Sequence, residues 1–167
     1  KLFESFRADL RNNPRGVGPG VAFAQSVYAA TGRPIGLIPC SHGGSGMSQW
    51  DPALKDQGDE SLYGAMVNRV KLVGGGNKIK GLLWYQGESD SSPKASPVFQ
   101  DKFENLVAAI RADFKQPDLP FYYVQIGRFV NKGGEVGWNL VQQMQLNAES
   151  RMARSGLVAA IDTDLDD

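Results

Sequence analysis

The sequence predicts an α/β protein whose sheet is mainly parallel and doubly wound. Short apolar runs with the length of buried strands alternate with longer segments whose apolar residues recur at helical intervals, which is typical of parallel strands joined by helical crossovers. Two of the apolar runs, residues 34–40 and 81–85, stop at polar turns that contain glycine. Open α/β sheets bind ligands beyond the carboxyl ends of their strands, so these turns mark the expected site.

The composition is that of one soluble globular domain, residues 1–167. Apolar residues make up 41% of the chain and charged residues 22%, and 18 basic side chains balance 18 acidic ones. This neutrality argues against a nucleic-acid or anionic-membrane partner, and no run approaches the roughly 20 apolar residues of a membrane span. A single cysteine, Cys40, and a single histidine, His42, are too few for a disulfide framework or a structural zinc site. We therefore expect no metal and no cofactor.

The first part of the chain is expected to hold two helices and a strand. Residues 1–11 have loosely helical spacing, and residues 12–20 form a Gly/Pro loop, which is only a weak dinucleotide signal because no strand precedes it. A helix over residues 21–30 would end at Gly32, ahead of the strand at residues 34–40. The expected buried face of that helix consists of Ala22, Phe23, Ser26, Val27 and Ala30.

The middle of the chain leads to the central strand. Residues 41–50 form a polar turn, residues 51–58 a surface excursion, and residues 62–73 a helix that the glycines at 74–76 end. The strand follows at residues 81–85. The apolar stripe of the helix is Leu62, Met66, Val70 and Val73.

The last part of the chain contains the most clearly amphipathic helix, residues 98–114. A β-rich strand follows at 121–126, then a glycine-bearing loop at 127–138, a helix at 139–154 and a last strand at 157–161. The apolar stripe of the amphipathic helix is Phe99, Phe103, Leu106, Val107, Ile110 and Phe114.

The two polar turns hold the residues that are suited to chemistry. Glycines in the first, SHGGSG at residues 41–46, expose backbone N–H groups that can bind an anion or a developing oxyanion. The second, QGESD at residues 86–90, combines an amide, two acids and a serine, and Gly87 allows the chain a sharp exit from the strand. An ordinary strand-to-loop transition explains one such turn more easily than two in succession.

Three motifs carry a resemblance to a known family. The runs LWYQGESD at residues 83–90, GLIPCSHGGS at 36–45 with Trp50 after it, and GPGVAFA at 18–24 resemble the SGNH-type acetylesterases. The likeness is to the sialate O-acetylesterase-like proteins of carbohydrate esterase family 6, and it runs over essentially the whole chain. It implies a three-layer α/β/α, flavodoxin-like fold. It also implies hydrolysis of acetyl esters on carbohydrates, either sialic acid or acetylated plant polysaccharide.

The resemblance also implies how the site works. A serine attacks the ester, a histidine near the C-terminus takes its proton, and an oxyanion hole stabilises the intermediate. The oxyanion donors would be the backbone N–H of Gly44, with Gly43 as the alternative, and the side-chain amide of Gln86. Glu88 would brace the site by hydrogen bonding rather than act as the base.

The acid that orients the histidine would be Asp167, with Asp166 and Asp164 as weaker matches. His42 lies in the oxyanion loop, where a histidine that orients the turn or lines the pocket is a better interpretation than a general base. The other residues expected to line the site are Ser41, Ser45 and Ser89.

The sequence departs from the family pattern at both ends. No Gly-Gln-Ser-Asn-like block supplies the nucleophile, and no histidine follows Asp167. The first, central strand is also missing, which would leave the strands near Leu37 and Leu83 without their shared neighbour. We therefore expect an incomplete domain, with further segments before Lys1 and after Asp167, and no activity in the chain as written.

Two other interpretations remain open. A non-catalytic carbohydrate-binding relative could keep the fold without the triad. An α/β-hydrolase is suggested by HGG at residues 42–44, which is similar to a lipase oxyanion loop, but the sequence lacks the Gly-x-Ser-x-Gly elbow of that fold.

Overall fold

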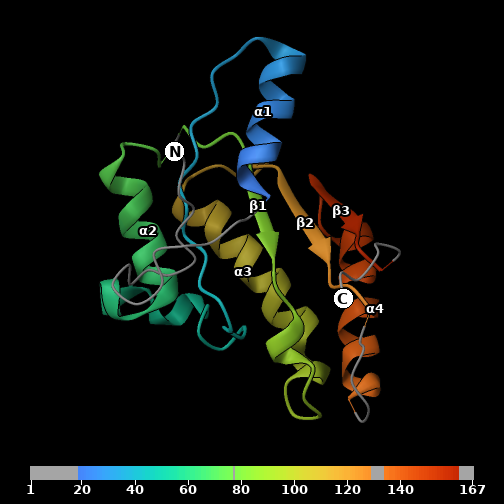
Figure 1. Cartoon of the computed structure of the whole chain (residues 1–167). Coiled ribbons are helices and arrows are strands. Elements are labelled where there is room, and N and C mark those ends of the chain that lie inside the picture. The colour runs from blue at the N-terminus through green and yellow to red at the C-terminus, as the bar shows by residue number, and fades with distance from the viewer. Residues whose placement is uncertain (1–18, 77, 129–133, 162–167) are drawn as a thin grey trace.

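The computed structural model describes residues 19–76, 78–128 and 134–161, and these form an α/β structure built on one sheet (Figure 1). Its helices are α1 (Gly20–Thr31), α2 (Leu62–Leu72), α3 (Phe99–Asp113) and α4 (Glu135–Arg151). Its strands are β1 (Leu82–Tyr85), β2 (Phe121–Gln125) and β3 (Ser155–Ala159). Short 3-10 segments lie at η1 (Pro52–Glu60), η2 (Glu88–Asp90) and η3 (Ser96–Val98). The helix expected at residues 1–11 and the loop before Pro19 lie outside the described residues.

The strands are parallel and follow one another in the order β1-β2-β3, which confirms the predicted α/β class and parallel sheet. Leu82 lies opposite Phe121, which in turn lies opposite Ser155. Helix α3 connects β1 to β2 and α4 connects β2 to β3, because parallel neighbours need a crossover. The carboxyl ends of all three strands therefore lie at the same edge of the sheet (Figure 1).

The core lies between one face of the sheet and helices α2, α3 and α4. Phe103 of α3 is fully buried, and its ring centroid lies 6.4 Å from that of Trp84, 5.7 Å from that of Phe121 and 5.0 Å from that of Tyr123. The stripe predicted for the amphipathic helix is confirmed, because all its members are buried. These are Phe99, Phe103, Leu106, Val107, Ile110 and Phe114.

The opposite face of the sheet carries exposed apolar side chains. Leu83 and Tyr85 of β1, Tyr122 of β2 and Val158 of β3 are between 38% and 60% exposed. In the described ranges, the helices that pack on the sheet lie on the other face. No helix among the described residues has the length and apolar character needed to cross a membrane.

Two helices contain glycines that touch backbone carbonyls of neighbouring segments. A Cβ at Gly64 of α2 would lie 2.3 Å from the carbonyl oxygen of Gly58, and one at Gly137 of α4 would lie 1.8 Å from that of Ser91. Both distances are far below van der Waals contact. The absence of a side chain at these positions lets each helix lie directly against a loop.

The prediction of a strand at residues 34–40 is wrong: in the structure this segment has no regular secondary structure. A strand is defined by its hydrogen bonds to a neighbour, and within the described residues β1 is paired only with β2. The segment is held by other contacts: the guanidinium of Arg69 in α2 donates to the carbonyl of Pro39, and Ile38 packs against the hydrophobic core.

The predicted burial of the first described helix is also wrong. Helix α1 forms where expected and ends at Gly32, whose φ of 66° is in the left-handed region that glycine tolerates. None of its residues is buried, and Phe23 and Tyr28 are 39% and 55% exposed. The apolar spacing of residues 21–30 predicts the helix correctly, but such a pattern does not indicate whether a packing partner is present.

Helix α4 and strand β3 begin earlier than predicted. Helix α4 starts at Glu135 rather than residue 139, so Gly137 lies inside the helix and not in the predicted loop, and there it is in close contact with Ser91. Strand β3 covers Ser155–Ala159 rather than residues 157–161, because its ends are set by its pairing with β2 rather than by its own apolar run.

A polar cluster joins η1, α2 and α3. The ammonium of Lys55 and the hydroxyl of the fully buried Tyr63 both donate to the carboxylate of Asp113, the hydroxyl at 2.8 Å. Burial alone would raise the pKa of Asp113, but the hydrogen bonds from Lys55 and Tyr63 and the charges of Lys55 and Lys71 outweigh it, so the pKa is lowered. Burial and the bond to Asp113 raise the pKa of Tyr63. At neutral pH the carboxyl of Asp113 therefore stays ionised and the hydroxyl of Tyr63 stays protonated.

We predict that Asp113→Asn lowers the free energy of unfolding by about 1–2 kcal/mol at pH 7, because it removes a charge-assisted acceptor from a buried hydroxyl. The pKa of Asp113 is lower in the folded chain than in the unfolded one, so its contribution is present at neutral pH and is lost as the pH falls below about 4. Urea unfolding at pH 7 and pH 3 measures both effects. Asp56→Asn, an exposed carboxylate in η1, is the control. Equal stability of the two variants at pH 7 would contradict the prediction.

Candidate functional site

The candidate site lies where the polar turn after residue 40 meets the loop that follows β1. The two segments are joined by side-chain hydrogen bonds from Gln86, which is buried. Its Nε2 donates to the carbonyl of Ser45 at 3.0 Å and to Oδ2 of Asp90 at 2.6 Å. The structure thus brings together the two polar turns at residues 41–46 and 86–90, at the carboxyl end of the sheet.

Asp90, in the loop after β1, holds the segment after residue 40 in place. It is 5% exposed, and its two carboxylate oxygens accept the backbone N–H of Met47 at 3.1 and 2.9 Å. Its Oδ2 also accepts the amide of Gln86. A carboxylate with these donors fixes the orientation of the Gln86 side chain, because the amide must present its nitrogen rather than its oxygen to the acid.

Among the described residues, the hydrogen bonds to the amide of Gln86 and to Met47 come from Asp90 rather than from Glu88. Both acids lie in the 3-10 turn η2, but the turn directs Asp90 inward and leaves Glu88 exposed. Glu88 lies near Tyr85, whose pKa is raised first by burial and then by the charge of Glu88. Sequence reasoning missed Asp90. The signal that could have found it is its position four residues after Gln86, which one tight turn brings close to the amide.

The glycine turn keeps its shape through the hydroxyl of Ser45. This buried hydroxyl donates to the carbonyl of His42 at 2.7 Å and accepts the indole N–H of Trp50 at 2.9 Å. Gly44 has a φ of 72°, a conformation that favours glycine. Within the described ranges, the backbone N–H groups of Gly43 and Gly44 have no acceptor, and both residues are exposed.

Three buried polar atoms near the site have no partner among the described residues. They are Oε1 of Gln86, Nδ1 of His42 and the indole Nε1 of Trp84. Ser41 and Ser89, which were expected to line the site, are both exposed at its edge. Asp164, Asp166 and Asp167 lie outside the described residues, so the predicted acid is not located here.

Helix α4 closes the back of the site. A Cβ at Gly87 would lie 2.9 Å from Ile126, 3.0 Å from Val141 and 3.1 Å from Gln145, so the loop can follow this path only with glycine at its start.

The aromatic residues near the site divide into two groups. Trp50 and Trp84 pack in the core against each other, with ring centroids 5.3 Å apart, whereas Tyr85 is 53% exposed.

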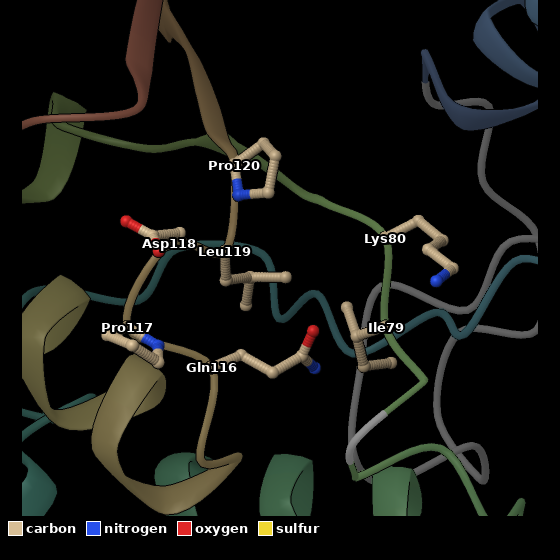
Figure 2. A pocket seen from close by; sticks show the side chains of 7 residues that line it. All are labelled: Ile79, Lys80, Gln116, Pro117, Asp118, Leu119 and Pro120. Carbon is tan, nitrogen blue, oxygen red and sulfur yellow. The ribbon is translucent and has the colours of Figure 1, made fainter.

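Other places in the fold are less suited to chemistry. A hollow of about 310 Å³ lies at the amino ends of β1 and β2, lined by residues 79, 80 and 116–120 (Figure 2). In Figure 2 the amide of Gln116 points into the hollow, and its nitrogen donates to the carbonyl of Gly76. Lys80 and Asp118 also line the hollow, but in Figure 2 their charged groups point away from the amide of Gln116. In the part of the chain that the structure describes, no three metal-ligating side chains come together.

Comparison with known proteins identifies a family. A family model described as carbohydrate esterase, sialic acid-specific acetylesterase, matches residues 3–167. The Arabidopsis thaliana protein named "Probable carbohydrate esterase" is 34% identical over 125 residues, which cover 70% of this chain and 46% of that protein. This chain therefore spans about half the length of that relative.

Solved structures agree with this result. A structure of a protein from Arabidopsis thaliana matches with a TM-score of 0.74 and 32% identity, over 93% of this chain and 60% of that one. The crystal structure of a carbohydrate acetylesterase from Xanthomonas citri matches with a TM-score of 0.74 and 27% identity, over 90% of this chain and 36% of that one.

We predict that Asp90→Ala lowers the free energy of unfolding by about 1–3 kcal/mol, because it leaves the buried N–H of Met47 and one N–H of Gln86 without an acceptor. Glu88→Ala, in the same turn but exposed, should change it by less than about 0.5 kcal/mol. Chemical denaturation of the two variants measures the difference. A larger effect for Glu88→Ala would return the bracing role to that residue.

Proposed function

Because the chain belongs to the carbohydrate esterase family of sialic acid-specific acetylesterases, we propose that the protein containing it is a serine acetylesterase. It removes O-acetyl groups from carbohydrates, from sialic acid or from acetylated plant polysaccharide. The observation that carries the proposal is the closure of the glycine turn onto the buried amide of Gln86 at the carboxyl end of β1. This arrangement offers backbone and side-chain N–H donors close together, as an oxyanion hole requires.

The reaction is an acyl transfer in two steps. A serine supplied by another part of the protein attacks the acetyl carbonyl, and a histidine oriented by Asp167 takes the serine proton. The histidine then gives this proton to the sugar oxygen as its bond to the acetyl carbon breaks, so that the sugar leaves with a free hydroxyl. Water then attacks the acetyl-enzyme and releases acetate. No cofactor or metal takes part in these steps.

The oxyanion is held by the N–H of Gly44, with Gly43 as the alternative, and by the amide of Gln86. The availability of the two glycine N–H groups supports this role. Both N–H groups of Gln86 already have acceptors, so the oxyanion must replace one of them. The neutral carbonyl of Ser45, at 3.0 Å, is the weaker acceptor and is the one exchanged, while the carboxylate of Asp90 keeps the amide oriented.

The other residues at the site have supporting roles. Ser45 shapes the glycine turn rather than acting as a nucleophile, because its hydroxyl is already donated to His42 and bonded by Trp50. His42 lines the pocket. Tyr85 and Glu88, both exposed beside the loop, are the residues that a sugar ring can contact first.

We predict that Gln86→Ala in the full-length protein lowers kcat for p-nitrophenyl acetate by about a hundredfold, because it removes one oxyanion donor. Gln143→Ala, an exposed glutamine on α4, is the matched control and should leave kcat unchanged. An unaffected rate in Gln86→Ala would remove this side chain from the oxyanion hole.

The class of enzyme is tested separately with a serine-directed inhibitor. We expect it to abolish hydrolysis by the full-length protein. Acetate release from O-acetylated sialic acid and from acetylated xylan then distinguishes the two substrate classes. Absence of hydrolysis on all three esters would favour a non-catalytic carbohydrate-binding protein.

A further inference from the structure

The hydrogen-bond ladder between β1 and β2 stops just before the site. The N–H of Leu82 donates to the carbonyl of Pro120 at 2.9 Å, and in a parallel ladder every second residue repeats this pattern. With the observed register, Trp84 and then Gln86 are the next residues of β1 to bond in this way. A ladder that continued would therefore join the N–H of Ile126 directly to the carbonyl of Gln86.

The side chain of Gln145, from helix α4, takes the place of that missing bond. Its Oε1 accepts the N–H of Ile126 at 3.0 Å, and its Nε2 donates to the carbonyl of Gln86 at 2.9 Å. One planar amide thus bridges the two strands at the point where they separate. A primary amide suits this place because it carries one acceptor and one donor on the same carbon.

The Gln145 bridge is buried, and the backbone of Gln145 is itself held by a hydrogen bond. Gln145 is 0% exposed, and its backbone carbonyl accepts the hydroxyl of the buried Tyr123 at 2.8 Å. One turn earlier on α4, Gln142 donates to the carbonyls of Ile126 and Gly127 at 2.9 and 2.8 Å. Helix α4 therefore satisfies the backbone groups of both diverging strand ends.

Packing leaves the bridge little freedom to shift. The loop passes α4 at Gly87, where a Cβ would lie 3.1 Å from Nε2 of Gln145, and the helix passes the loop at Gly137. The loop and the helix therefore have no room to shift if position 145 carries a side chain with different hydrogen-bonding groups. The two hydrogen bonds from the Gln145 side chain to the strands therefore fix the path of the backbone at Gln86.

We propose that Gln145 is a positioning residue for the acetylesterase reaction: it holds the backbone of Gln86 apart from β2 and so directs the Gln86 side chain toward the oxyanion. This inference rests on the proposed function. Gln145 does not touch the substrate. It acts by fixing the backbone carbonyl of Gln86, whose side-chain amide contacts the oxyanion.

The first test replaces Gln145 by Met, which keeps the volume and removes both hydrogen bonds. In the full-length protein we expect kcat for p-nitrophenyl acetate to fall about tenfold or more with little change in KM, because a small displacement of a catalytic group is costly. Gln143→Met, on the exposed side of the same helix, should have no effect. Rates are measured well below the melting temperature of each variant.

The second test uses Gln145→Glu, which is isosteric. A protonated carboxyl can donate to Gln86 and accept from Ile126, whereas the ionised form can only accept and repels the carbonyl of Gln86. Burial raises the pKa of such a carboxyl above its ordinary value near 4.3. The ratio of kcat in the variant to kcat in wild type should therefore approach one at pH 5 and fall about tenfold by pH 8. Gln143→Glu should keep a constant ratio, and a constant ratio in Gln145→Glu would overturn the proposal.

A third measurement does not depend on activity. Amide hydrogen exchange at Ile126 should be slow in wild type and in Gln143→Met and at least tenfold faster in Gln145→Met. Unchanged exchange at Ile126, or unchanged kcat in an active enzyme, would refute the role of Gln145 and leave the esterase intact. If exchange at Ile126 is faster in Gln145→Met but the wild-type protein has no esterase activity, the bridge is supported, while the proposed function and with it the catalytic part of the role are refuted.

Discussion

The site depends on the separation of two strands that are paired up to Tyr85. Where parallel strands diverge inside a protein, the N–H and carbonyl groups just beyond the last pair can no longer bond to each other. A buried group without a hydrogen-bond partner lowers the free energy of unfolding by about 1–3 kcal/mol. Here glutamine side chains of α4 satisfy those groups from behind the sheet. The strands can then part without leaving these groups unpaired, and β1 continues into a loop that carries polar side chains.

A second buried side chain at the candidate site also joins two segments, with a carboxylate in place of an amide. Asp90 accepts the backbone N–H of Met47, directly after the glycine turn, and the amide of Gln86, so that one buried acid joins two segments that are more than 40 residues apart. A network of this kind is sensitive because each member is the partner of another. It specifies one arrangement of the two turns, and this explains how loops without regular structure can hold a defined geometry.

Much of the fold could be predicted because it is encoded locally. The amphipathic stripe of α3 marks a buried helix, and the apolar run that stops at Gln86 marks β1. Predictions that depended on a partner were wrong. Residues 34–40 have the composition of a strand but no neighbour among the described residues, and α1 has the spacing of a packed helix but no buried side chain.

The polar details of the site could not be predicted, for a related reason. Two acids two residues apart look equivalent in the sequence, and only the geometry of the turn makes Asp90 the buried one and Glu88 the exposed one. Gln145 reads as one of several glutamines on a helix. Its importance follows from the register of β1 and β2, which no local pattern contains.

The two helical glycines have a consequence for protein engineering. Replacing a glycine in a helix by alanine is a standard way to raise thermal stability, since alanine gains up to about 1 kcal/mol in helix propensity. At Gly64 and Gly137 the added methyl would collide with a loop carbonyl. A stabilisation campaign should therefore leave both unchanged, and should treat Gly137 with particular care, because the loop it touches leads to the candidate site.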